Sequence, residues 1–141
     1  MNLSVIRALL RARLLTVPDL LLVQWEAVAF TQPATETYLD DDLRGGTNAT
    51  QSSGTTQTRP LYVLTIHTPP ERILADGDRL VDAIGAAFEP GRTLTDAART
   101  HWLEITTLDM GALRVLPSGW GYRRLAVGLT AAAFRTTLQT A

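Results

Sequence analysis

Two histidines and a run of three aspartates are the residues of this sequence best suited to acid–base or metal chemistry. His67 lies late in an apolar segment and His101 opens another, and no His-x-x-x-His or His-Glu-x-x-His spacing links them. A small hydrolase that pairs one of these histidines with an aspartate is therefore an alternative that the spacing does not favour. The sequence also lacks the Gly-x-Ser-x-Gly, P-loop and Gly-x-Gly-x-x-Gly patterns, so we expect no enzyme.

Asp40, Asp41 and Asp42 form the densest charge cluster of the chain. In a strand, Asp40 and Asp42 point to one face of the sheet and Asp41 points to the other. Such a run can hold a divalent cation together with waters, cover a strand edge with solvated charge, or contact arginines of a neighbouring subunit. The solvated edge is the favoured interpretation, and we expect no metal and no cofactor.

Composition narrows the function classes further. The absence of cysteine excludes disulfides, thiolate metal sites and cysteine nucleophiles. A nucleic-acid-binding module is another alternative. The formal net charge of -1 argues against it, because such modules carry a clear basic excess. Arginines at 7, 11 and 13 interrupt the first apolar segment, so we expect neither a signal peptide nor a membrane span, and a protein of the cytoplasm.

The elements that must position these residues follow from hydrophobic periodicity in a single domain, residues 1–141. Apolar residues at helical spacing predict two amphipathic helices, 3–15 and, beginning at a Pro-Pro pair, 70–88. Gly77 on the apolar face of the second helix suggests close packing on a sheet. Extended segments are expected at 23–30, 37–44, 59–68, 92–95, 101–108 and 120–134. This pattern is typical of an α+β fold, a mostly antiparallel β-sheet with two α-helices packed on one face.

One long segment, "RGGTNATQSSGTTQTR" (44–59), carries no charge between its two arginines and almost no apolar residue. We interpret residues 45–58 as a flexible polar loop, and residues 135–141 as a loose C-terminal tail. A domain of this size rarely keeps so long a loop without a use for it. An uncharged polar loop can become ordered against a partner when it binds, so we expect this one to reach out of the subunit.

The order of these segments resembles that of the tail terminator (tail completion) proteins of long-tailed bacteriophages, and in particular a small phage family related to the lambda tail terminator. The resemblance covers residues 3–133 and depends on "VQWEAVAF", "LYVLTIHTPP" and "DAIGAAFEPG". One departure is "LDDDLR", where a more apolar second strand is expected.

The resemblance implies a structural virion protein that is assembled in the host cytoplasm and located in the tail or neck. Such proteins form a hexameric ring that caps the head-proximal end of the tail tube, ends tube polymerisation and joins the tail to the head connector or head-closure protein. Genomic DNA is only a passing occupant of the lumen. The alternative is another neck protein of the same particle, a head-closure or connector component.

Charge and the polar loop together give the candidate subunit or partner interface. Arg123 and Arg124 begin the last strand with their side chains on opposite faces, and they are candidates together with the arginines of the first helix. The candidate residues are Arg7, Arg11, Asp40, Asp41, Asp42, Arg44, Thr47, Asn48, Gln51, Thr55, Gln57, Arg59, Arg123 and Arg124.

Overall fold

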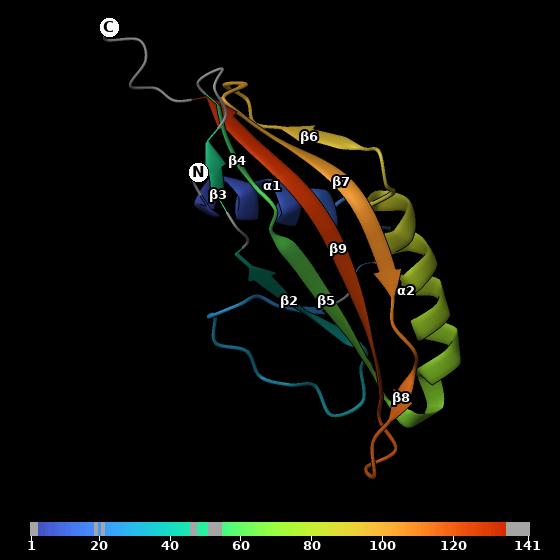
Figure 1. Ribbon diagram of the computed structural model, residues 1–141. Helices are drawn as coiled ribbons and strands as arrows, with labels where there is room; N and C mark the ends of the chain where they lie inside the picture. The colour runs from blue at the N-terminus through green and yellow to red at the C-terminus, as the bar shows by residue number, and fades with distance from the viewer. Residues whose placement is uncertain (1–2, 19, 21, 46–47, 51–54, 135–141) are drawn as a thin grey trace, which may run out of the picture.

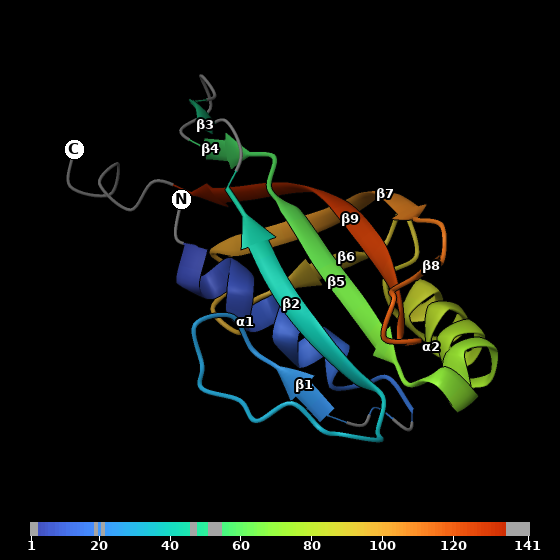
Figure 2. The same cartoon turned by 90° about the horizontal axis from the view of Figure 1, so that it is seen from below.

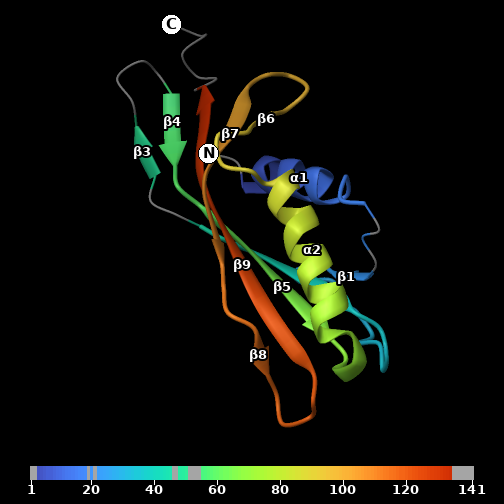
Figure 3. The same cartoon turned by 90° about the vertical axis from the view of Figure 1, so that its right-hand side faces the viewer.

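A computed structural model describes residues 3–18, 20, 22–45, 48–50 and 55–134. Helices α1 (Leu3–Leu14) and α2 (Ile73–Ala87), the latter preceded by the 3₁₀ turn η1 (Pro70–Arg72), lie on the same side of a curled, mixed sheet (Figure 3). The fold is therefore α+β with a mostly antiparallel sheet, as predicted. No helix of the described residues is long and apolar enough to cross a membrane.

Strand β9 (Gly121–Phe134) is the centre of the sheet (Figure 1). One of its edges pairs first with β5 (Leu61–Thr68) and then with β4 (Thr55–Thr58), and the other pairs with β7 (His101–Met110) and β8 (Arg114–Val115). Further out, β2 (Tyr38–Arg44) is antiparallel to β5, β1 (Leu22–Gln24) is parallel to β2, β3 (Asn48–Thr50) pairs with β4, and β6 (Thr93–Thr95) pairs with β7.

The core lies between the two helices and the sheet (Figure 2). The predicted stripe of α1 is buried at Ile6, Leu10 and Leu14, although Leu3 at its start is 46% exposed. In the last strand Leu125, Val127 and Leu129 alternate with Arg124, Ala126 and Gly128, which predicts one apolar face, and these apolar residues do face the helices. Each fully buried aliphatic side chain stabilises the fold by about 1.5–3 kcal/mol, so this face fixes the register of the sheet. The buried residues of strands and helices that meet here include Leu39, Leu64, Leu80, Ile84, Phe88, Leu103, Ile105, Leu125 and Val127.

The first predicted strand is much shorter than expected. Residues 23–30 were expected to be extended, but β1 ends at Gln24 and the chain turns, with Ala27 in the left-handed region at φ 62°. Hydrogen bonds made by the Glu26 side chain explain the turn. Its carboxylate accepts one from Arg7 and one from the backbone N–H of Leu43 on β2. These contacts draw Glu26 across the edge of β2, so the backbone cannot continue as a strand.

The polar segment 44–59 contains two short strands, which the sequence analysis did not predict. β3 and β4 form a hairpin, and β4 continues the edge of β9 beyond β5, opposite residues 131–134. β9 is 14 residues long and β5 only eight, so β5 does not reach the C-terminal end of β9. The backbone N–H and C=O groups on that edge need another strand as hydrogen-bond partner, and β4 provides it. Residues 46–47 and 51–54, like the tail 135–141, lie outside the described residues.

Gly77 is buried, but not because the helix packs closely there. A Cβ built on Gly77 would meet no atom within 4 Å. The expectation of close packing on the sheet is therefore wrong. Gly111, in contrast, lies close to backbone, since a Cβ there would be 2.8 Å from the carbonyl oxygen of Arg124.

Candidate functional site

The sheet face opposite the helices, called the open face here, is the surface that the fold leaves uncovered (Figure 3). Because side chains alternate along a strand, the residues between the core positions point to this face. The register places them in rows across three strands, for example Tyr38 beside His67 and His67 beside Tyr122. The open-face residues of these strands are Tyr38, Asp40, Asp42 and Arg44 on β2, Leu61, Val63, Thr65 and His67 on β5, and Tyr122, Arg124, Ala126 and Gly128 on β9.

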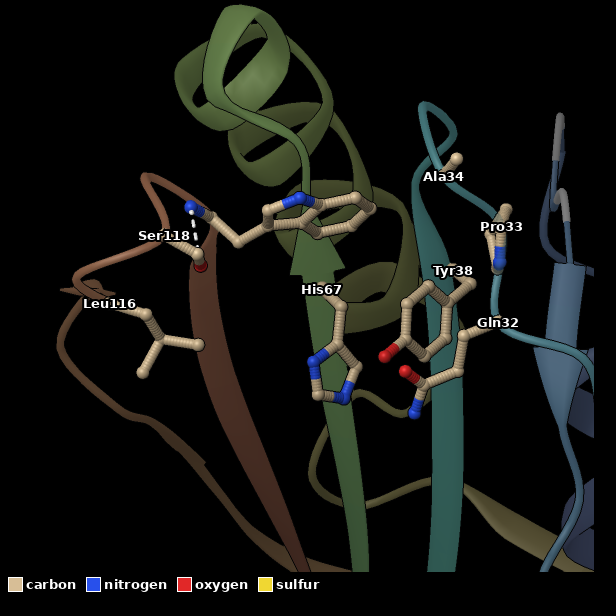
Figure 4. A pocket seen from close by; sticks show the side chains of 8 residues that line it. Gln32, Pro33, Ala34, Tyr38, His67, Leu116 and Ser118 are labelled. Atoms are coloured by element: carbon tan, nitrogen blue, oxygen red, sulfur yellow. Dashed lines mark hydrogen bonds between the residues drawn. The ribbon is translucent and has the colours of Figure 1, made fainter.

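The open face is hollowed at the end where β8 turns into β9 (Figure 4). The cavity here has a volume of about 390 Å³. On its wall the ring of His67 is stacked on the ring of Tyr38, with the centroids 4.4 Å apart. The ring of Trp120 also lines it, with its centroid 6.1 Å from that of Tyr38. Its other lining residues are Gln32, Pro33, Ala34, Leu116 and Ser118. A second hollow of about 420 Å³ shares His67 and Leu116 with the first and extends to Arg124. The two form one groove with aromatic and charged walls.

Neither histidine is arranged for nucleophilic catalysis. His67 Nε2 lies 2.7 Å from Asp40 Oδ2, and no described hydroxyl is bound to its other ring nitrogen. His101 uses one nitrogen, Nδ1, for both the Thr100 hydroxyl at 2.9 Å and the Asp96 carboxylate at 3.5 Å. A catalytic relay needs the nucleophile and the carboxylate on opposite ring nitrogens, so neither cluster can transfer a proton along such a chain.

The aspartate run alternates as predicted, but its middle member is not on the surface. The Asp41 side chain is 1% exposed and accepts four hydrogen bonds. Arg11 donates from Nε at 2.9 Å and from Nη2 at 3.3 Å, the Tyr62 hydroxyl donates at 2.8 Å, and the backbone N–H of Glu26 donates at 2.8 Å. Asp41 and Arg11 therefore satisfy each other within the subunit, and their place in the candidate interface stays a prediction. Among the described residues no group of three or more His, Cys, Asp or Glu could hold a metal ion.

The Arg11–Asp41–Tyr62 network attaches α1 to the sheet. Burial, reinforced by the Asp41 carboxylate, raises the pKa of the Tyr62 phenol, so the hydroxyl stays a donor. The hydrogen bond to Asp41 raises the pKa of Arg11 against the opposing effect of burial. The Arg11 guanidinium also lies over the ring of Trp25, 4.9 Å from its centroid. This network has a structural role and leaves no group free for chemistry.

The two neighbouring arginines at the start of β9 point to opposite faces of the sheet. Arg123 points to the helix side, where Nη1 lies 3.5 Å from Asp78, and Arg124 points to the open face with its guanidinium 5.7 Å from the Tyr122 ring centroid. The predicted opposite orientation of this pair is confirmed. On the rim of the groove, Arg44 donates to Asp42 at 3.1 Å, and this pair is exposed.

The candidates of the polar segment lie at the end of the sheet away from β8 (Figure 1). Thr47 and Gln51 fall outside the described residues, and so do the side chains of Asn48 and Thr55. Gln57 is half-buried and Arg59 is exposed. The structure thus places candidates on two outward surfaces, the open-face groove and the β3–β4 hairpin, which is called the arm below. Arg7, Arg11, Asp41 and Arg123 belong to neither, because they lie on the helix side of the sheet.

The sequence pattern does not predict the aromatic groove. Its walls come from the segment before β2, from β5 and from the β8–β9 turn, which are far apart in sequence. A partial signal is present in "GWGY" (119–122), where Trp120 and Tyr122 have strand spacing and so share a face.

Comparison with known proteins supports the fold and gives the family. Five chains of solved structures match, one of which, a protein without a functional name, superposes with a TM-score of 0.69 at 17% sequence identity, covering 96% of this chain and 97% of its own. At that identity the likeness supports the fold alone. No curated protein matches the sequence. Residues 5–111, from α1 through β7, match the family described as phage tail terminator protein. The chain belongs to the phage tail terminator protein family.

Proposed function

We propose that the chain is the subunit of a hexameric ring that caps the head-proximal end of the phage tail tube. The ring ends tube polymerisation and joins the tail to the head connector, and genomic DNA only passes through its lumen. The family match over residues 5–111 carries this proposal. A tail terminator is a structural virion protein, so the match also implies that the chain is not an enzyme.

The surfaces of the subunit support this function. A ring subunit must contact two neighbours as well as the tube and the connector, and therefore needs several separate surfaces. The open-face groove and the arm lie apart on the sheet, toward opposite ends of β9 (Figure 1). We assign contacts between subunits to the groove, with Asp42, Arg44 and Arg124 among them, and contact with the tube or connector to the arm.

Tube capping tests the function directly. Tail tube protein would be polymerised with and without the purified chain, and tube lengths measured by negative-stain microscopy. We expect substoichiometric amounts of the chain to stop elongation and leave a ring at one end of each tube. Tubes that elongate normally would overturn the proposal. Binding to the portal or adaptor with no effect on tube length would identify a head-closure or connector component instead.

The role of the arm has its own test. Deleting residues 46–57 would also remove β4 from the edge of β9, so a narrower change is required. Replacing residues 51–54 by Asn-Gly shortens the connection and keeps both strands. We expect the variant to unfold at the wild-type urea concentration but to lose tube capping. If it caps tubes as well as the wild type, the tip of the arm makes no essential contact.

A further inference from the structure

The outward face of α2 carries two carboxylates and a leucine in a line. Leu74, Asp78 and Asp82 follow one another at four-residue spacing, so they lie on one side of the helix about 6 Å apart. Leu74 is 65% exposed and the Asp78 side chain 62% exposed. Asp78 has a long contact to Arg123, at 3.5 Å, and Asp82 has no ion-pair partner among the described residues. These three residues are called the acidic stripe.

The open face carries a matching line of opposite charge. Arg114 on β8 is directly opposite Tyr122 on β9, two residues from Arg124, so the two arginines are diagonal neighbours about 7–8 Å apart. Both are exposed, and neither has a carboxylate partner among the described residues. Leu116 is two residues beyond Arg114 and lines both hollows of the groove. Arg124, Arg114 and Leu116 are called the basic stripe.

The two stripes have the same order and nearly the same spacing. Asp82, Asp78 and Leu74 at about 6 Å intervals would face Arg124, Arg114 and Leu116 at about 7 Å intervals, giving one ion pair at Asp82, a second at Asp78 in addition to its long contact with Arg123, and one apolar contact. Within one subunit they cannot meet, because α2 is on the helix side of the sheet and the basic stripe is on the open face (Figure 3).

We propose that the acidic stripe of α2 docks onto the basic stripe in the open-face groove of a second copy of this chain. The inference rests on the proposed ring and names the two surfaces that form it. A second copy is the occupant because one chain presents both halves of the match, and the two halves carry opposite charge. The contact joins two different faces, so it is heterologous and closes into a ring when the rotation between subunits is suitable.

Charge reversal tests this contact. The full-length wild type, Arg124→Glu, Asp82→Arg and the double variant would be compared by native mass spectrometry and sedimentation velocity over a concentration series. Each single reversal places like charges opposite each other, and we expect association at least tenfold weaker than in the wild type. The double variant restores the pairing at every contact and should assemble. Arg99→Glu, at an exposed position in the turn between β6 and β7, is the matched control and should assemble normally.

Mixing the two single variants gives a sharper readout. The groove of Arg124→Glu then meets the arginine on α2 of Asp82→Arg, and the unaltered groove of the second variant meets the unaltered α2 of the first. Every contact is complementary only when the two variants alternate, so the mixture should form rings of even subunit number that neither variant forms alone. Loss of folding cannot produce this rescue.

The outcomes separate the inference from the proposed function. The contact between the acidic and basic stripes is supported if the wild type forms rings, each single variant associates more weakly, and the mixture of the two forms rings again. If the wild type forms rings and both reversals still do, or if mixing rescues nothing, the contact is elsewhere and the inference is overturned while the proposed function stands. A wild-type chain that forms no ring in solution or on tube ends overturns both.

Discussion

Replacing Asp41 by asparagine should destabilise the subunit more than any other isosteric change at a charged residue of β2. The carboxylate accepts two hydrogen bonds at each oxygen, Arg11 Nε and the Tyr62 hydroxyl at Oδ2, and Arg11 Nη2 and the Glu26 N–H at Oδ1. In asparagine one of these two oxygens is replaced by an NH2 group. This group is itself a donor, so the two donors that bound the replaced oxygen lose their acceptor.

The magnitude follows from these contacts. Each buried donor left without an acceptor costs about 1–3 kcal/mol, and Arg11 would also lose its counter-charge. Together these give a loss of about 3–5 kcal/mol, the range measured when one partner of a buried ion pair is removed. A domain of 141 residues has a free energy of unfolding of about 7–20 kcal/mol, so the variant should still fold.

Urea unfolding at pH 7, followed by tryptophan fluorescence on monomeric protein, measures this loss. Asp42→Asn is the matched control, since Asp42 is the next residue of β2, points to the open face and pairs with Arg44 in an exposed position. We expect its cost to stay within about 0.5 kcal/mol. The reasoning is refuted if Asp41→Asn costs less than about 1 kcal/mol, or no more than Asp42→Asn.

Three further predictions concern α2 and the turn after β7. The bidentate hydrogen bond from Arg72, at 2.7 and 2.8 Å, lowers the pKa of Asp76 from 3.8 to about 2. Stability from this group is therefore present above pH 4 and lost as pH falls from about 4 to 2, by about 2 kcal/mol. In urea titrations the wild type should lose about this much more stability over that range than Asp76→Asn, which keeps the contributions of the other carboxylates. Gly77→Ala should raise the free energy of unfolding by about 0.5–1 kcal/mol, because the helix gains a better former and the new methyl group has room. Gly111→Ala should lower it by about 1–3 kcal/mol, because its Cβ would press on the Arg124 carbonyl, and equal melting temperatures for the two glycine variants would contradict this account.

Sequence periodicity alone determined most of the architecture. The helical spacing of apolar residues predicted α1 to within one residue, and predicted α2 with a start three residues too early, where the 3₁₀ turn η1 lies. The two-residue alternation of Leu125, Val127 and Leu129 predicted which side of β9 faces the core. These patterns are local, since the backbone of one helix or strand fixes which side chains share a face. The same locality showed that Arg123 and Arg124 point to opposite sides of the sheet.

Contacts between distant segments were decided only by the tertiary structure. Arg11 and Asp41 are 30 residues apart, and a run of three aspartates does not reveal that its middle member lies beneath a helix. The strands of the arm form because β5 does not reach the C-terminal end of β9, where β4 pairs instead. Their own polar sequence does not predict them. The groove likewise forms only when Tyr38, His67 and Trp120 are brought together by three separate segments. In each case the physical reason is the same: pairing energy comes from a partner that the local sequence does not contain.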